Sequence, residues 1–400
     1  MNRAYETRSY LKEISTVVTA AGIDEKGFNY AEFEDTVFFP NEGGQNADTG
    51  TVTVLYEDGD KGSDARELRV LDGALLNGGI RYTVSGELMP GMKVKLALDW
   101  GKRYDRMQNH SGEHILTGVI HNRYGYDNVG FHLSDTGFVT LDLSGPLTYE
   151  QVIECEDEAN GIIYRNLPIK DSYPSTEELK SIDYRSKIDI DGQVRLITIG
   201  DEGGAVDICA CCAPHVARTG EVGIIKVFSA INWKGGVRIS ILCGRRALEY
   251  INREHDILTS VARSLSTEAV NVPELVDQYR TQALDLKAKL AKAREDAVTE
   301  KIEAAGARGP LCVFVDDDFP AASMKNVYNA LRAVHEKYVG VFAGSDEEGY
   351  RYNAGGKESR KLAALLTGKF GAKGGGSDEM IQGKLAASRG QIEEFFNEQV

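Results

Sequence analysis

The segment Asn109–Leu116, NHSGEHIL, places two histidines four residues apart with a glutamate between them. Apolar residues around it recur at helical spacing, which predicts a helix from about 106 to 124 that ends at Gly125. On such a helix His110 and His114 differ by only about 40° around the axis, so both can bind one metal ion. The pattern also matches the H-x-x-E-H motif of one class of zinc peptidases. The segment alone therefore leaves the kind of site open.

A second group of metal-binding residue types follows in the segment Cys211–His215, CCAPH. Three of the six cysteines fall within four positions, which does not suit a disulfide framework and, beside a histidine, favours a metal site. We prefer Cys211 as the thiolate ligand because it lies four residues before the histidine; Cys209 and Cys212 remain alternatives. The predicted zinc ligands are His110, His114, Cys211 and His215. A closed site that only stabilises the fold and a catalytic site are both compatible with this set.

Two further residues, Glu113 and His132, are candidates for a role beside the motif histidines. Glu113 would act as the base of a peptidase, but it lies about 60° from His110 and about 100° from His114 around the axis. We therefore expect it to contact a ligand from outside or to lie at the surface. His132 is a candidate to line the same cleft.

Composition restricts the class of protein. The chain has 400 residues, 42% hydrophobic and 27% charged, which is ordinary for a globular protein of two or three domains. It has no apolar run of about 20 residues and no signal peptide at its polar start, so we expect a cytoplasmic protein without a membrane anchor. The net charge of −15 confines any nucleic-acid contact to local basic patches. Residues 355–389 form such a patch, with seven basic and three acidic side chains.

The chain as a whole reads as an α+β protein. Alternating apolar and polar residues predict short strands in a small N-terminal β-barrel, and a glycine-poor segment predicts a long, coiled-coil-like helical connector. This connector either forms a dimer or packs on its own chain. The last part reads β-α-β-α, with a glycine-rich loop at 371–377 and a final helix at 379–397. The predicted divisions are 1–95 (barrel), 96–245 (α+β, zinc-binding), 246–305 (connector) and 306–400 (α/β domain).

Four motifs in order carry a resemblance to a known family. They are GGQ-x-x-D-T-G at 43–50, H-x-x-x-H at 110–114, C-x-x-x-H-V at 211–216 followed by RTGEVG at 218–223, and GGGS-x-x-M-x-Q at 374–382. Together they resemble the editing domain of alanyl-tRNA synthetase and, more closely, its free-standing AlaX-type relatives. The resemblance implies zinc-dependent hydrolysis of mischarged Ser-tRNA(Ala) or Gly-tRNA(Ala). Because little sequence precedes the first predicted strand, we expect editing in trans, without an aminoacylation domain.

The same resemblance assigns roles to residues. His110, His114, Cys211 and His215 would hold Zn²⁺, and Gln45 would reach the cleft beside His110 and His114 near the aminoacyl end. The C-terminal part resembles the synthetase's DHHA1 domain, which helps to bind tRNA and to form a homodimer. Its tRNA-binding residues would be Lys373, Gly374, Gly375, Gly376 and Gln382. Two departures leave the amino-acid specificity open: Glu42 replaces a glycine, and CCAPH replaces CGGTH.

Two alternatives to the editing hydrolase remain from the sequence. A zinc peptidase requires an acidic third ligand on a later helix and an essential Glu113. A non-catalytic tRNA-binding protein requires a saturated structural zinc site and a C-terminal domain that binds RNA without turnover. Neither the misacylated amino acid nor a general base can be read from the residues.

Overall fold

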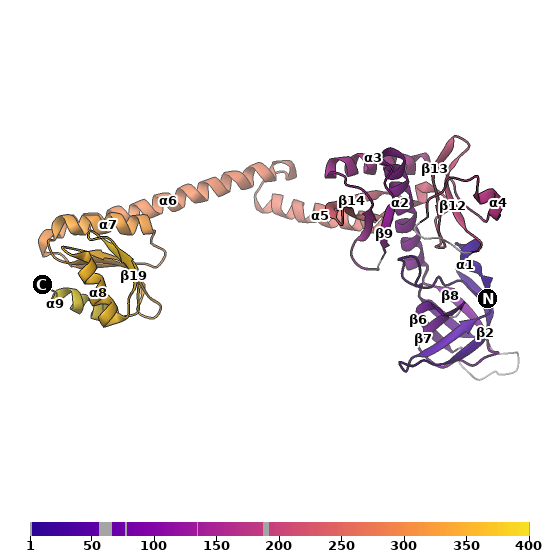
Figure 1. Ribbon diagram of the computed structural model, residues 1–400, viewed down its shortest axis with the longest axis horizontal. Helices are drawn as coiled ribbons and strands as arrows, with labels where there is room; N and C mark the ends of the chain where they lie inside the picture. The colour runs from indigo at the N-terminus through magenta and orange to yellow at the C-terminus, as the bar shows by residue number, and fades with distance from the viewer. Residues whose placement is uncertain (1, 56–65, 77, 134, 187–191, 400) are drawn as a thin grey trace. The chain divides into compact units, whose positions relative to one another are not determined.

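The structure is a computed structural model that describes residues 2–55, 66–76, 78–133, 135–186 and 192–399 (Figure 1). The chain forms two compact units, Met1–Ile257 and Leu258–Val400. The architecture is mixed α+β, as predicted. Among the described residues, no helix combines the length and the apolar character needed to cross a membrane. The finer four-part division of the chain stays a prediction.

The first unit begins with a closed six-stranded barrel, which confirms the predicted N-terminal β-barrel. Side chains along its strands alternate between buried and partly exposed, because successive residues of a strand point to opposite faces. The strands, in barrel order, are β2 (Glu13–Ile23), β3 (Asn29–Phe33), β7 (Gly79–Val84), β6 (Glu67–Leu76), β5 (Gly50–Val54) and β8 (Lys93–Leu98). A short N-terminal segment, β1 (Asn2–Arg3) and α1 (Ala4–Thr7), reaches β4 (Asp35–Thr36) through a parallel pair.

The long helix α2 (Trp100–Tyr124) follows the barrel and carries the histidine motif. It starts six residues before the predicted position because Asp99 accepts a hydrogen bond from the Lys102 backbone and caps the helix. Its predicted end is confirmed: Gly125 has φ 71°, the left-handed conformation that favours glycine. A capping box of Thr148 and Gln151 begins α3 (Tyr149–Arg165).

Two sheets complete the first unit. The four-stranded sheet has the order β14 (Ile225–Trp233), β15 (Gly236–Cys243), β10 (Val139–Leu143), β9 (Asn128–His132). The three-stranded sheet has the order β11 (Ile169–Ser172), β12 (Leu196–Asp201), β13 (Gly204–Ala210). Helices α4 (Thr176–Leu179) and α5 (Gly244–Ser264) follow β11 and β15 in the chain. The core that packs on α2 draws residues from both sheets and from α3.

The second unit contains a five-stranded sheet in which only the first pair is parallel. Its strand order is β16 (Cys312–Val315), β17 (Val339–Ser345), β18 (Gly349–Gly355), β20 (Ile381–Leu385), β19 (Lys373–Gly376). Its helices are α6 (Val272–Ala305), α7 (Ala321–Val334), α8 (Ser359–Phe370) and α9 (Arg389–Glu398). The core beneath α7 includes Ile302 from the end of α6.

Two predictions in this unit are wrong. The glycine-rich segment is the edge strand β19, because glycine lets it approach β20 closely: a Cβ on Gly374 would lie 2.1 Å from the Gln382 carbonyl oxygen. The final helix begins at Arg389, and Ile381–Leu385, which lie inside the predicted helix, form β20. Ile381 and Leu385 are both buried, and a spacing of four fits a helix turn as well as one face of a strand.

Candidate metal centre

Helix α2 places the two motif histidines side by side, as their spacing predicted. The rings of His110 and His114 are nearly parallel, with centroids 5.4 Å apart and an interplanar angle of 21°. Both side chains are buried, and the ring of Phe131 packs on His110 at a centroid distance of 4.6 Å. The neighbouring residue on β9, His132, is exposed because successive strand residues alternate in direction. Phe131, which the sequence did not single out, therefore faces the site in its place.

The loop after β13 brings the other two predicted ligands to the histidine pair. Cys211 Sγ lies 3.3 Å from His215 Nε2 and 3.6 Å from His110 Nε2. One ligand atom from each of His110, His114, Cys211 and His215 lies within 4.8 Å of the other three. The histidine pair and the Cys211–His215 pair lie about a hundred positions apart in the chain. These four residues are called the metal centre below. Three imidazoles and one thiol are a donor set typical of Zn²⁺, so the residues present fit this ion.

Each histidine of the metal centre is oriented by a partner on its Nδ1 atom. His110 Nδ1 donates to the side-chain oxygen of Gln45 at 2.8 Å, and His114 Nδ1 donates to Asp207 at 3.0 Å. His215 Nδ1 lies 3.0 Å from Ser111 Oγ. With Nδ1 engaged, each ring presents Nε2 toward the centre. Such outer partners fix the ring and its tautomer in natural metal sites, so their presence supports a metal-binding function.

The protonation states of two ligands suit a metal ion. Burial alone would raise the pKa of Cys211, but the neighbouring imidazoles of His110 and His215 lower it well below its ordinary value. Burial lowers the pKa of His215 to about 3, which keeps that imidazole neutral. A thiolate and a neutral imidazole are the forms that bind metal.

The carboxylates around His114 raise its pKa, whereas the pKa of His215 is lowered. Burial alone would lower the pKa of His114, but Glu113 and the hydrogen bond to Asp207 raise it well above its ordinary value. Burial would raise the pKa of Asp207, yet its hydrogen bonds to His114 and Arg185 lower it, so the carboxylate stays ionised. A carboxylate on the outer nitrogen makes an imidazole a more basic ligand.

Cys209 and Cys212, the two alternatives to Cys211, have different surroundings. Cys209 forms a second possible metal-binding group with His114 and Asp207. Asp207, however, also accepts a hydrogen bond from Arg185 Nε at 2.8 Å, so we assign it to orienting His114. The Cys212 thiol hydrogen-bonds the Glu42 carboxylate, and burial raises the pKa of Cys212. Among the three thiols, Cys211 alone shares a group with all three histidines of the centre.

Glu113 is buried, so the expectation that it might lie at the surface is wrong. Its carboxylate accepts hydrogen bonds from Asn128 and from Thr117 Oγ1, and Glu113 Oε2 lies 3.7 Å from His114 Nε2. Glu113 therefore lies near the nitrogen of His114 that faces the metal centre, and the other expectation, that it contacts a ligand from outside, stays a prediction. The peptidase alternative requires an acidic ligand from a later helix, whereas the described residues grouped with His110 and His114 are Cys211 and His215 from a loop.

The glycine loop places Gln45 beside His110. Gln45 is 2% exposed, and its backbone exchanges hydrogen bonds with Glu42. Gly44 has φ 83°, and a Cβ there would lie 2.3 Å from the Phe131 carbonyl oxygen, so glycine is required at this position. The side-chain nitrogen of Gln45 is buried without a hydrogen-bond partner among the described residues. A buried donor of this kind is available to a bound substrate.

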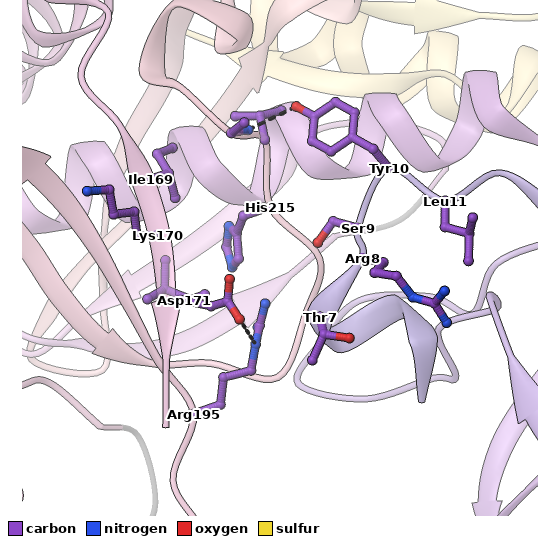
Figure 2. A pocket seen from close by; sticks show the side chains of 13 residues that line it. Thr7, Arg8, Ser9, Tyr10, Leu11, Ile169, Lys170, Asp171, Arg195 and His215 are labelled. Carbon is purple, nitrogen blue, oxygen red and sulfur yellow. Dashed lines mark hydrogen bonds and ion pairs between the residues drawn. The ribbon is translucent and has the colours of Figure 1, made fainter. Parts of the chain in front are cut away.

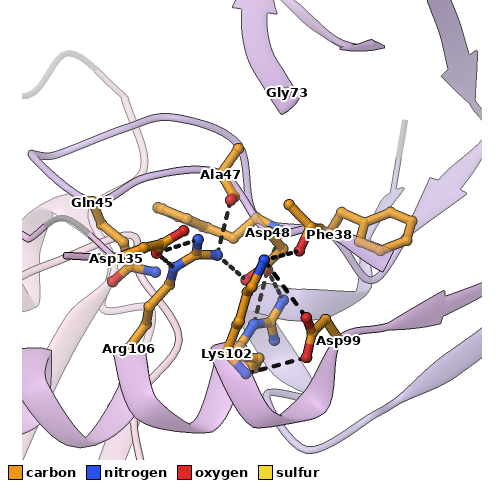
Figure 3. Close-up of polar contacts among 12 residues, drawn as sticks. Phe38, Gln45, Ala47, Asp48, Gly73, Asp99, Lys102, Arg106 and Asp135 are labelled. Atoms are coloured by element: carbon orange, nitrogen blue, oxygen red, sulfur yellow. Dashed lines mark hydrogen bonds and ion pairs between the residues drawn. The ribbon is translucent and has the colours of Figure 1, made fainter. Parts of the chain in front are cut away.

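A buried ion network, which the sequence reading missed, holds this loop on α2 (Figure 3). Arg103 Nε donates to Asp48 at 2.8 Å, and Arg106 Nη1 donates to the same carboxylate at 3.2 Å. Arg106 also pairs with Asp135 at 2.6 Å. The two arginines precede His110 by seven and four residues and therefore share its helix face. That spacing, together with the aspartate of GGQNAD, was the available signal.

The predicted tRNA-binding residues lie in the second unit on the β19–β20 hairpin. Lys373, Gly374, Gly375 and Gly376 are exposed along the edge strand, and Gln382 is paired with Gly375. Lys373 faces Lys384 directly across the hairpin. The structure thus collects these residues on one exposed hairpin in place of a loop.

Comparison with known proteins agrees with the motifs. Residues 194–239 match the family described as the threonyl and alanyl tRNA synthetase second additional domain. The chain is 29% identical to alanyl-tRNA editing protein AlaX-L of Pyrococcus horikoshii, over 98% of this chain and 96% of the relative. It is 25% identical to a putative alanyl-tRNA editing protein of Saccharomyces cerevisiae, over 89% and 85%. It also matches 43% of an alanine–tRNA ligase of Ignicoccus hospitalis at 27% identity. The resemblance to the AlaX-type proteins is therefore confirmed along nearly the whole chain.

Proposed function

We propose, from this resemblance to the alanyl-tRNA editing proteins, that the chain hydrolyses the ester of misacylated tRNA(Ala) in trans. The expected substrates are Ser-tRNA(Ala) and Gly-tRNA(Ala). The observation that carries the proposal is the convergence of three oriented imidazoles and one thiol in a chain that resembles editing proteins from end to end. An aminoacyl ester is an activated bond, so a single site of this kind suffices for its hydrolysis.

His110, His114, Cys211 and His215 would hold Zn²⁺ through Nε2 and Sγ. When bound, zinc supplies Lewis acidity that favours attack of water on an ester carbonyl. The chain's own residues position this chemistry. Gln45, Asp207 and Ser111 fix the three rings, and the ring of Phe131 covers His110 and excludes water from that side.

Gln45 has a second role in the proposal. Its oxygen is engaged by His110, which leaves its buried side-chain nitrogen to donate to the substrate. A donor at the ester carbonyl, or at the ribose hydroxyl beside it, orients the bond relative to the metal centre. Glu113 is held by Asn128 and Thr117, so we assign it to supporting His114 rather than to moving a proton.

We propose that the β19–β20 hairpin contacts the tRNA backbone through Lys373, Gly374, Gly375, Gly376 and Gln382. Two lysines directly opposite each other, here Lys373 and Lys384, repel, and a phosphate between them removes the repulsion. The exposed glycines add no side chains that would keep a backbone at a distance. Replacing Lys373 by alanine should weaken tRNA binding and reduce its salt dependence; replacing Lys369, which pairs with Glu398, serves as the control.

We propose further that α6 pairs with α6 of a second copy. Its apolar side chains Tyr279, Leu286 and Leu290 are about half or more exposed, with Leu286 at 63%. A helix with such a stripe commonly forms a dimer. Sedimentation of the full chain should give twice the mass of one chain, and glutamate at Leu286 and Leu290 should give one chain. A wild-type protein that sediments as one chain would contradict this pairing.

A deacylation panel tests the enzymatic proposal. Ser-tRNA(Ala), Gly-tRNA(Ala) and correctly charged Ala-tRNA(Ala) are incubated with the zinc-loaded protein, and the remaining ester is counted. We expect fast loss of at least one misacylated ester and slow loss of the correct one. If none of the three esters is hydrolysed while tRNA binding is intact, the non-catalytic alternative is favoured. Peptide cleavage that requires Glu113 would favour the peptidase.

A further inference from the structure

The glycine turn at 43–44 places Glu42 and Gln45 opposite each other. Gln45 N donates to Glu42 O at 3.0 Å, Glu42 N donates to Gln45 O at 3.2 Å, and the two residues form an antiparallel bridge. Gly43 and Gly44 between them have φ 59° and 83°, and a type I′ turn requires positive values at both positions. Residues directly opposite in such a pair project to the same face, with Cβ atoms about 4.5–5.5 Å apart. Because the Gln45 side chain faces His110, Glu42 projects to the side of the metal centre.

A contact with the metal loop agrees with this direction. The Cys212 thiol, next to the proposed ligand Cys211, hydrogen-bonds the Glu42 carboxylate. Both Glu42 and Cys212 stand where the chain departs from the family motifs, so two of these departures form one contact. The glycine turn and the metal loop therefore meet at the Glu42 carboxylate.

One acceptor and one donor on this face have no partner from the protein. Glu42 Oε2 and Gln45 Nε2 are both buried without a hydrogen-bond partner among the described residues. A buried polar atom without a partner costs free energy, so each of these atoms is suited to a group that arrives with a ligand. The ligand must bring a donor to Glu42 and an acceptor to Gln45.

The donor that suits Glu42 is a cation. Burial raises the pKa of Glu42, and the charge of Cys211 raises it further, because an anion at this place is poorly compensated. Arg3 acts on Glu42 through its charge but makes its ion pair with Glu6, at 3.2 Å. A positive group at Oε2 would offset the cost of burying this carboxylate.

The cavity behind the metal loop is not an alternative place for such a cation. This cavity of about 430 Å³ borders the metal centre through His215, and Asp171 is the one acidic side chain in its described lining (Figure 2). Asp171 Oδ2 already lies 4.0 Å from Arg195 Nε. Glu42, in contrast, forms no ion pair among the described residues and is the better partner for a cationic ligand group.

The aminoacyl ester carries both of the required groups next to each other. Its α-carbon joins the ester carbonyl to an α-ammonium group, so an acceptor and a cationic donor are one carbon apart. We infer that Glu42 binds the α-ammonium group of the aminoacyl ester while Gln45 donates to the ester carbonyl. This inference rests on the proposed function and defines its substrate class as esters with a free α-amino group.

The experiment is a substrate–protein cycle with the full-length, zinc-loaded protein. One tRNA(Ala) carries serine, and the other carries glyceric acid, in which a hydroxyl replaces the α-amino group of serine. Glycine and glycolic acid give a second pair of esters. Values of kcat/KM are divided by the spontaneous rate of hydrolysis of each ester, so that the intrinsic difference between the esters cancels.

The proteins are the wild type, Glu42→Gln and Glu42→Gly. Glu32→Gln is the matched control, because Glu32 is a partly buried glutamate of the same unit that pairs with Arg81 at 3.2 Å. Zinc per chain is measured for each protein.

We expect the wild type to prefer the amino ester by about 10- to 100-fold, the scale of one hydrogen bond between charged groups. Both Glu42 variants should lose activity on the amino ester until this preference is less than about threefold, whereas Glu32→Gln should keep it. A wild type without the preference, a preference that survives Glu42→Gln, or an equal fall for both esters would overturn the inference while leaving the proposed hydrolysis intact. A wild type that hydrolyses none of the four esters would overturn the proposed function and the inference with it.

Discussion

Helices α2 and α6 are both long and both rich in charged residues, yet they are buried to opposite extents. Fifteen of the 25 residues of α2 are buried, including Arg103, Arg106 and Glu113. Three of the 34 residues of α6 are buried, while Leu284, Leu286 and Leu290 are exposed. The polar helix is thus buried within its unit, and within one chain the helix with the leucine stripe lies mostly in solvent. Polarity in the sequence does not by itself report burial.

The difference arises from partners contributed by distant segments. Burying a charge costs free energy unless it is paired and hydrogen-bonded. Asp48 accepts hydrogen bonds from the two buried arginines of α2. Gln45 and Asp207 accept hydrogen bonds from its two motif histidines. Helix α6 has charged pairs of its own, such as Lys289 with Asp285, but they lie in solvent and contribute little. Four substitutions, taken from the largest expected effect to the smallest, test this contrast.

The largest effect is expected for Asp48→Asn. The change leaves Arg103 and Arg106 buried beside a neutral side chain, and breaking such a pair costs about 3–5 kcal/mol in the free energy of unfolding. Both tryptophans, Trp100 and Trp233, lie in the first unit, so their fluorescence in a denaturant titration reports on that unit alone.

The control for that change is Asp135→Asn, which removes the other partner of Arg106. The Asp135 side chain is 41% exposed, so its loss should cost less than about 1 kcal/mol. Equal costs for the two aspartates would show that burial does not set the strength of the network.

His110→Ala tests the metal centre itself. Removing a ligand should reduce zinc content to near zero and slow deacylation of the sensitive misacylated tRNA by more than about 100-fold, since even partners of ligands are worth about 10- to 100-fold. Zinc per chain is measured by elemental analysis. His121→Ala, on the same helix but 37% exposed and paired with Asp127, should keep both zinc and activity. Full activity in a zinc-free His110→Ala protein would contradict the proposed role of the metal.

Ser111→Ala removes the partner of His215 Nδ1 and leaves all four ligands in place. We expect zinc affinity to fall by about 10-fold, because an unsupported ring must be ordered when the metal binds. Competition with a chromophoric chelator measures the affinity. Ser264→Ala on α5, where the hydroxyl only contacts a helix carbonyl, is the control and should leave the affinity unchanged.

The smallest effect is expected on α6. Leu286→Ala should change the stability of the second unit within one chain by less than about 0.5 kcal/mol, because the side chain is 63% exposed. The matched change on α2 is Leu116→Ala, whose side chain is fully buried and whose loss should cost about 2–5 kcal/mol. Circular dichroism in denaturant, at a concentration where the protein is a single chain, measures the stability change of Leu286→Ala. Tryptophan fluorescence measures that of Leu116→Ala. A large cost at Leu286 under these conditions would place that side chain in a core.

The predictions from sequence succeeded where the signal is local. The alternation in the barrel strands and the helix end at Gly125 depend on residues a few positions apart, and both are confirmed. They failed where a local signal had two meanings. Glycines at 374–376 suit a loop as well as a closely packed edge strand, and only the pairing with β20 decides between them.

The sequence by itself determined which residues are candidates to bind a metal and that the chain resembles the AlaX-type editing proteins, because residue type and motif spacing are properties of the chain. Only the tertiary structure decided that Asp48 pairs with two buried arginines, that Asp207, Ser111 and Gln45 orient the three rings, and that Arg195 binds the backbone of the loop that carries Cys211 and His215. Each of these contacts joins segments far apart in sequence. Their free energy depends on distance and burial, which are set only when the sheets and α2 pack together.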